Sequence, residues 1–198
     1  MKLISILLFI FFSNALLAQE QSQPLIDDTA YIYRSLSAAL ANPERVYRLN
    51  LSHHRLKKFP ADILKLTNLR DLDLSKNKLD SIPNEIGTLT NLERLNLSNN
   101  NLVQLPDEIG NLSSLTYLGL NRNVIESLPV TIGNLEKLEV LELWDNELTT
   151  VPDAIMKCKN LKVLELRGIL FYDEEHERLD TLLPDVKVYL SPGCNCKY

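Results

Sequence analysis

The sequence predicts an α/β solenoid, in which each repeat adds one strand to a single parallel concave sheet and a cap closes each end. Two observations support this prediction. The segment "LDLSKNKLDSIP" at 72–83 returns at steps of 23 residues as "LNLSNNNLVQLP", "LGLNRNVIESLP" and "LELWDNELTTVP", with no insertion or deletion. Its apolar residues are spaced too unevenly for an amphipathic helix or an alternating strand. A constant period between about 20 and 50 residues is typical of solenoids and repeat arrays.

The chain has 198 residues, which is enough for one domain. The extent of the repeats divides it into four parts. We expect a signal peptide at 1–18, an N-terminal helical cap region at 19–45, the repeats at 46–172, and a C-terminal cap and tail at 173–198. The six repeats begin at Val46, Leu69, Leu92, Leu115, Leu138 and Leu161.

The first residues are typical of an export signal. Lys2 precedes an apolar stretch at 3–12, and small residues follow, with cleavage expected after Ala15 or Ala18. The alternative is a membrane anchor, but that requires about 20 apolar residues, and polar residues at 13–14 interrupt the stretch too early. The sequence therefore predicts a protein that is secreted, periplasmic or at the cell surface, without a membrane span.

Within each repeat, the segment around Leu72 and Leu74 is predicted to be a short strand with both leucines pointing inward. Asp71, Asp73 and Ser75 alternate with them and point outward. No repeat can bury its apolar residues alone, so the core exists only when the coils stack. The same interior is expected to receive Leu69, Leu79, Ile82, Ile86 and Leu89.

An asparagine follows each of four strands, where the chain turns and leaves backbone groups without partners in the sheet. A side-chain amide offers both an acceptor and donors to such groups. The alternative, an exposed turn that favours asparagine for its left-handed geometry, explains one asparagine better than four in register. We therefore predict a structural asparagine ladder at Asn77, Asn100, Asn123 and Asn146.

Prolines and glycines occupy two further columns. Proline fixes φ and lacks an N–H group, so it suits the start of a short helical turn on the outer side of each coil. Glycine in the second column is expected to let that turn reverse tightly. The proline column holds Pro60, Pro83, Pro106, Pro129 and Pro152, and the glycine column holds Gly87, Gly110 and Gly133.

The combined pattern, "LxxLxLxxNxLxxLPxxIxxL", resembles the 23-residue leucine-rich repeat from about residue 46 to 172. The resemblance implies a horseshoe-shaped solenoid that takes part in protein–protein interaction. The flanks "SLSAALANPERVYRLNLS" and "EEHERLDTLLPDVKVYL" are similar to the ends of secreted bacterial leucine-rich repeat proteins, including those of pathogenic spirochaetes. For such relatives, contact with host or extracellular molecules is expected.

Both flanks also have the features of caps. After Asp28, a helical face is expected at Ile32, Leu36 and Ala39/Leu40, and Asn42-Pro43 should end that helix. At the other end, Asp173 is expected to cap a helix that stops at Pro184. Its inner face would hold His176, Leu179 and Leu182/Leu183, and "VKVYL" would form a final strand.

The sequence favours no enzyme, cofactor or metal site. Phosphate-loop, nucleophile-elbow and zinc-protease motifs are absent from it. His53 and His54 would point to opposite sides of the chain. Glu142 and Glu165 share a column, but on an open sheet they are expected to form a solvated face rather than a glycosidase cleft.

Net charge limits the classes of partner, and cysteine content limits the possible disulfides and metal sites. The whole chain carries a charge of −5, or −6 without the predicted signal peptide, which argues against nucleic acid or an anionic membrane as the main partner. Cys158 takes a leucine position and should be buried. Cys194 and Cys196 could bridge each other, or one could reach Cys158, and together they lack further metal ligands.

We predict the partner-binding site on the C-terminal half of the concave face, where the open strand faces carry aromatic residues and arginine. Trp144 and Arg167 share a column about 4.8 Å apart, so the guanidinium could stack on the indole. Gly119 would leave a recess beside Glu142. The alternative is that Trp144 only covers Asn121 and Arg167. The predicted site comprises Tyr117, Arg122, Val140, Glu142, Trp144 and Arg167.

Two functions fit these features. The first is an exported interaction module, expected to be monomeric, that binds a protein, or alternatively a glycan, through the concave face. The second is a structural or envelope spacer whose concave face has no tight ligand. Capture of a partner would favour the first, and the absence of one would favour the second.

Overall fold

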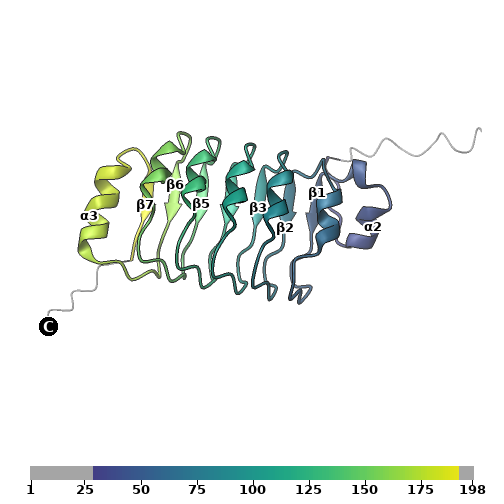
Figure 1. Cartoon of the computed structure of the whole chain (residues 1–198), viewed down its shortest axis with the longest axis horizontal. Helices are drawn as coiled ribbons and strands as arrows, with labels where there is room; N and C mark the ends of the chain where they lie inside the picture. The colour runs from purple at the N-terminus through teal and green to yellow at the C-terminus, as the bar shows by residue number, and fades with distance from the viewer. Residues whose placement is uncertain (1–28, 192–198) are drawn as a thin grey trace, which may run out of the picture.

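The repeats and the C-terminal cap build a single sheet of seven parallel strands in chain order, which follow one another along the horizontal long axis of the molecule in Figure 1. The computed structural model describes residues 29–191. The strands are β1 (Arg48–Asn50), β2 (Asp71–Asp73), β3 (Arg94–Asn96), β4 (Tyr117–Gly119), β5 (Val140–Glu142), β6 (Val163–Glu165) and β7 (Lys187–Tyr189). The predicted solenoid with one parallel sheet is confirmed.

The strand register follows the repeat period. Arg48 pairs with Asp71, and each later pair keeps the offset of 23 residues up to β6. The last pair, Val163 with Lys187, is offset by 24 residues. The C-terminal cap therefore makes one more coil of almost the same length, although it contains an α-helix.

Leucines from successive coils form one continuous core inside the solenoid. Leu72, Leu95, Leu118 and Leu141 are completely buried, as are Leu74 and its equivalents in the next three coils. Cys158 is buried in the same core, as predicted, and this burial raises the pKa of its thiol to about 11. Cys194 and Cys196 lie outside the described residues, as does the predicted signal peptide.

The outer side of the coils carries five short 3₁₀ helices, each preceded by a proline as its N-cap. This placement confirms the predicted role of the proline column, because proline already has the backbone φ that a helical turn needs. The helices are η3 (Ala61–Lys65), η4 (Asn84–Thr88), η5 (Asp107–Asn111), η6 (Val130–Asn134) and η7 (Asp153–Lys157).

The glycine column has a different cause from the predicted one. Gly87, Gly110 and Gly133 are not in the left-handed region, which a tight reversal would require. Instead, a Cβ atom on Gly87 would lie 2.7 Å from the backbone oxygen of Glu108 in the next coil, and the other two glycines are crowded in the same way. Glycine is needed here because the 3₁₀ helices of consecutive coils touch.

The helix of the N-terminal cap is shorter than predicted. Helix α2 (Leu36–Leu40) begins at Leu36 behind Ser35, and the short helix η2 (Pro43–Arg45) follows it. Ile32 therefore lies outside the helix, contrary to the prediction. The segment around it is extended: the N–H group of Tyr33 donates to Arg48 O at 3.0 Å, and Asn50 N donates to Tyr33 O at 2.8 Å. The open edge of β1 thus gains a hydrogen-bonded bridge at Tyr33, which outweighs the helical pattern.

The C-terminal cap contains helix α3 (Asp173–Leu182), which ends before Pro184 as predicted. Asp173 is the first helical residue rather than the cap, since Tyr172 occupies the N-cap position. Leu179 and Leu183 are buried against the last coil, whereas His176 and Leu182 are half-buried. The predicted final strand is β7.

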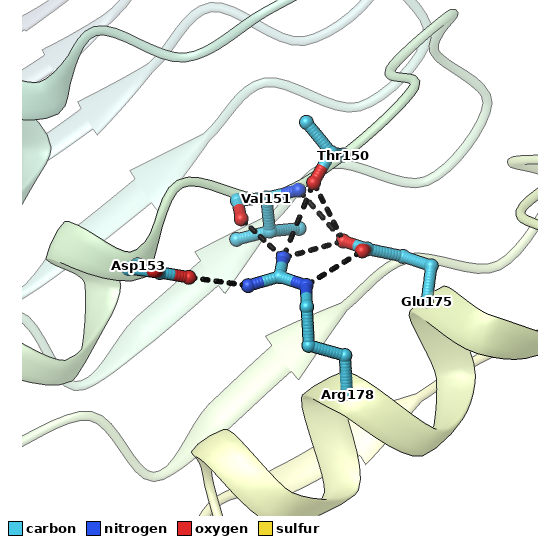
Figure 2. Close-up of polar contacts among 5 residues, drawn as sticks. All are labelled: Thr150, Val151, Asp153, Glu175 and Arg178. Atoms are coloured by element: carbon cyan, nitrogen blue, oxygen red, sulfur yellow. Dashed lines mark hydrogen bonds and ion pairs between the residues drawn. The ribbon is translucent and has the colours of Figure 1, made fainter.

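A polar clamp joins α3 to the segment before η7, as Figure 2 shows. Both carboxylate oxygens of Glu175 accept hydrogen bonds from Arg178, at 2.7 Å each. One of them also accepts a bond of 2.9 Å from Val151 N and one of 3.1 Å from the Thr150 hydroxyl. Arg178 in turn donates to Asp153 and to the carbonyl of Val151. The clamp therefore joins the cap helix to the repeat that begins at Leu138.

Candidate functional site

The concave face is formed by the outward side chains of the strands and of the turns that follow them. Strand pairing places the first column in register, and its members change from charged to apolar toward the C-terminus. A broad open surface of this kind is what solenoids use for binding. The column contains Arg48, Asp71, Arg94, Tyr117, Val140 and Val163.

Side chains of the N-terminal half pair mostly with one another. Arg48 donates to Asp71 at 3.0 Å, and Asn50 donates to Asp73 at 3.2 Å. A shallow hollow of about 260 Å³ lies above them. Ion pairs this exposed contribute little to stability because water screens them and their side chains must be ordered. The hollow is lined by Ile32, Arg48, Leu49, Asn50, Asp71, Asp73, Arg94, Asn96 and Tyr117.

Tyr117 connects the two halves of the face. Its hydroxyl donates to Glu142 Oε2 at 2.9 Å, and the guanidinium carbon of Arg94 lies 4.2 Å from the centre of its ring. Burial raises the pKa of Tyr117, and the hydrogen bond to Glu142 raises it further, so the phenol stays neutral. The ring crosses over Gly119, where a Cβ atom would lie 2.7 Å from the Tyr117 hydroxyl. The recess predicted at Gly119 is therefore filled.

The cation that stacks on Trp144 is Arg122 and not Arg167, so that predicted contact is wrong. The guanidinium carbon of Arg122 lies 4.5 Å from the centre of the indole ring. Arg122 lies in the turn of the preceding coil, where its own backbone is left-handed with φ at 56°. Its Nε atom is 3.6 Å from the carboxylate oxygen Oδ2 of Asp145. Trp144 itself is half-buried.

Arg167 is held instead by Glu165 on its own strand segment. Two of its nitrogens donate to the two carboxylate oxygens of Glu165 at 2.7 Å each, and its guanidinium carbon lies 5.4 Å from the centre of the Tyr189 ring. A carboxylate bound at two points is a stronger partner for a guanidinium than an aromatic ring. Glu165 is only 7% exposed, which corrects the prediction of a solvated acidic column.

The six predicted residues therefore fall into two contacting pairs and two separate members. The structure brings together Tyr117 with Glu142, and Arg122 with Trp144, whereas Arg167 belongs to the Glu165 and Tyr189 group. Val140 lies half-buried between Tyr117 and Val163 in the first column. Sequence reasoning missed Tyr189, since the offset of 24 residues at the last strand takes it out of the repeat column.

The predicted asparagine ladder is confirmed. In Asn100, the side-chain oxygen accepts from Leu79 N at 3.0 Å, and the side-chain nitrogen donates to Leu97 O at 2.9 Å and Leu74 O at 3.1 Å. The amide thus binds its own coil and the preceding one. The same pattern holds at Asn77, Asn123 and Asn146.

A second asparagine column on the outside of the coils escaped the sequence analysis. Asn68, Asn91 and Asn160 donate to the carbonyls of Glu44, Thr67 and Glu136 in the preceding coil, at 2.8, 3.0 and 2.7 Å. Their common position in the 23-residue period was the available signal. Ser114 and Lys137 interrupt the column.

Neither a metal cluster nor a spanning helix is found between residues 29 and 191. No three metal-binding side chains approach one another there, and no helix of that part is long and apolar enough to cross a membrane. His54 is exposed, with Nδ1 2.8 Å from the carbonyl oxygen of Ser52.

Two family models match the repeats and the C-terminal cap. One, described as a leucine rich repeat, covers residues 44–102, and the other, a leucine-rich repeat region, covers residues 106–182. The chain belongs to the leucine-rich repeat family. Members of this family are typically non-enzymatic modules that bind other proteins.

Solved leucine-rich repeat proteins of bacteria have similar structures. An internalin from Listeria monocytogenes aligns over 78% of this chain with 23% identity and a TM-score of 0.67. Internalin C2 of the same organism aligns over 77% with 25% identity and a TM-score of 0.66. A leucine-rich repeat protein of Leptospira interrogans aligns over 81% with 30% identity and a TM-score of 0.46.

The chain spans 44%, 64% and 58% of the length of these three leucine-rich repeat structures, in the order given. No curated protein matches its sequence. The similarity expected between this chain and bacterial leucine-rich repeat proteins is confirmed at the level of the fold by the two internalins.

Proposed function

We propose that this leucine-rich repeat protein is an exported recognition module that binds a protein partner through the C-terminal half of its concave face. The observation that carries the proposal is the stacked pair of Arg122 and Trp144, with 4.5 Å between the guanidinium carbon and the ring centre. Tryptophan and arginine are the side chains most enriched at binding hot spots. Because the pair is already ordered, less conformational entropy is lost when a partner binds.

The surroundings of this pair support the same assignment. The half-buried Val140 and Val163 give the face an apolar strip, which is bordered by the hydrogen-bonded Tyr117 and Glu142 on one side. Lys187 continues the column on the other side and is exposed. An apolar centre with a polar rim is the usual composition of a protein interface.

Export is the second part of the proposal and depends on the sequence of residues 1–18. Their charged start, apolar centre and small residues have the order of a cleaved signal. A protein exported in this way would meet host or other extracellular molecules, and we propose these as the partners.

A capture experiment tests the proposed function. Immobilised protein is exposed to extracellular and cell-surface fractions, alongside the variants Trp144→Ala and Val130→Ala. Val130 is 70% exposed on the outer side of the coils, in η6, and serves as the matched control. We expect a partner that the wild type and Val130→Ala retain and that Trp144→Ala loses. A partner retained by all three proteins would contradict the concave site, and no capture at all would favour a structural spacer.

A further inference from the structure

The turns that follow the first strands contain a concentrated positive charge, although the chain as a whole carries a charge of −5. In the turn at 52–59, there are three cationic side chains and no acidic one. The next turn, at 75–82, adds two lysines and one aspartate, Asp80. These cationic residues are Arg55, Lys57, Lys58, Lys76 and Lys78, and we call them the basic patch.

The charge of the turns changes steadily along the solenoid. The equivalent turn at 98–105 has no charged residue, and the turn at 121–128 balances Arg122 with Glu126. The turn at 144–151 carries two acidic residues and no basic one. The basic patch is therefore a local feature of the N-terminal end and does not follow from the repeat pattern itself.

Hydrogen bonds between the first two coils place these cations side by side. Lys78 N donates to Leu56 O at 2.8 Å, so Arg55 and Lys78 occupy equivalent positions on neighbouring coils. Like charges in such positions repel each other. All five side chains are exposed, and in the part of the chain that the structure describes none has a carboxylate oxygen within 4.0 Å.

The acidic groups nearby neutralise only part of the patch. Asp80 occupies the position in the second coil that Lys57 has in the first and offsets one of the five positive charges, but it forms no ion pair within 4.0 Å with any of them. It accepts a hydrogen bond of 2.8 Å from the Ser81 hydroxyl. Asp62 pairs with Lys65 at 2.7 Å, and Asp71 pairs with Arg48. The field of the patch therefore extends into solvent, where it would attract a polyanion.

We propose that the basic patch binds a sulfated polysaccharide. Clusters of arginine and lysine attract polyanions through release of counterions, and sulfate groups spaced along a flexible chain can follow cations spread over two coils. A lipid surface fits less well, because none of the large exposed apolar residues lies within 52–82. Nucleic acid fits less well. Apart from histidines, the aromatic side chain in these two turns is Phe59, which packs against the core and so offers no platform on which a base could stack.

Affinity for a heparin oligosaccharide, measured by calorimetry over a range of salt concentrations, tests the proposal. The triple variant K57Q/K76Q/K78Q removes three charges from the patch. The control K137Q/K157Q/K159Q removes three exposed lysines elsewhere and changes the net charge equally. We expect the patch variant to bind about tenfold more weakly or worse, with the slope of log Kd against log salt reduced by about 2 to 3. The control should stay within about twofold of the wild type.

Three outcomes would overturn the proposal. Equal losses in both variants would mean that net charge alone is responsible, and absence of heparin binding by the wild type at low salt would remove the site. Tighter patch-dependent binding to duplex DNA, or to vesicles containing phosphatidylserine, than to heparin would assign the patch to another class of partner. Melting temperatures of both triple variants establish that they are folded. Because the patch is separate from Trp144, these results do not decide the proposed function.

Discussion

The interior columns of the solenoid and its concave columns follow opposite rules. Inside, the same residue type returns from coil to coil, with leucine in strands β1 to β6 and asparagine in the ladder of the four middle coils. On the concave face, the column that begins at Arg48 passes through Asp71, Tyr117 and Val163 and ends at Lys187. The interior must repeat because each coil packs on a copy of itself. The concave face is free to vary, so partner specificity can reside only there and at other exposed sites.

The comparison predicts that changes in the interior and at its ends affect stability, whereas changes on the concave face affect binding. Deleting residues 173–198 is expected to have the largest effect. It would remove α3 and β7, expose the last leucine layer that Leu179 and Leu183 cover, and leave β6 as an open edge. Light scattering should show association of the truncated chain, and a monodisperse, fully folded truncation would contradict this account.

Asn100→Ala is expected to lower the free energy of unfolding by about 1–3 kcal/mol, because it leaves buried backbone groups of two coils unpaired. Asn101→Ala is the matched control, since it makes the same exchange at the exposed neighbouring position. Denaturant titration of both variants checks the difference. Equal stabilities would remove the ladder as a stabilising element.

The same division between interior and concave face separates what the sequence predicted correctly from what it did not. The columns of leucine, asparagine and proline were predictable because backbone stacking alone determines their surroundings. The partner of Trp144 was not, since Arg122 reaches it diagonally from the preceding coil while Glu165 holds Arg167. The recess at Gly119 failed for the same reason, because the long side chain of Tyr117 crosses from one coil to the next. A repeat pattern specifies positions and not the directions of long side chains.

The N-terminal cap shows a second limit of prediction from sequence periodicity. The helical periodicity at 32–40 is real, but the free edge of β1 takes the segment at Tyr33 as a partner, so only Leu36–Leu40 become helical. The glycine column shows that a residue's cause can also be misjudged, since contact between neighbouring coils and not a tight turn explains it. Leu64 and Met156 replace glycine at the two ends of the column. Met156, whose following coil carries α3 instead of a 3₁₀ helix, is 57% exposed.

A smaller effect is expected from the clamp in Figure 2. Burial alone would raise the pKa of Glu175, but hydrogen bonds from Arg178, Val151 and Thr150 outweigh it, and the net effect lowers the pKa. A lowered carboxyl pKa stabilises the fold above the pKa of the unfolded chain, about 4.3 for glutamate, and this stabilisation is lost as pH falls through the folded value.

Glu175→Gln should therefore melt below the wild type at pH 7 and approach it near pH 3. The difference at pH 7 is expected to be only about 1 kcal/mol, because Arg178 is partly and Asp153 largely exposed to solvent. Glu174→Gln changes an exposed neighbour and serves as the control. A gap between Glu175→Gln and wild type that stays constant from pH 7 to pH 3 would show that the charge of Glu175 contributes nothing.

The smallest effect on stability and the largest on binding are expected at Trp144. The most direct test of this division of roles is a paired measurement of Kd for the captured partner and of Tm, on the wild type and Trp144→Ala. We predict that binding weakens by about 2 kcal/mol or more, since the variant removes the indole on which Arg122 stacks, while Tm stays nearly unchanged. An unaltered Kd, or a fall in Tm as large as that of Asn100→Ala, would contradict the account.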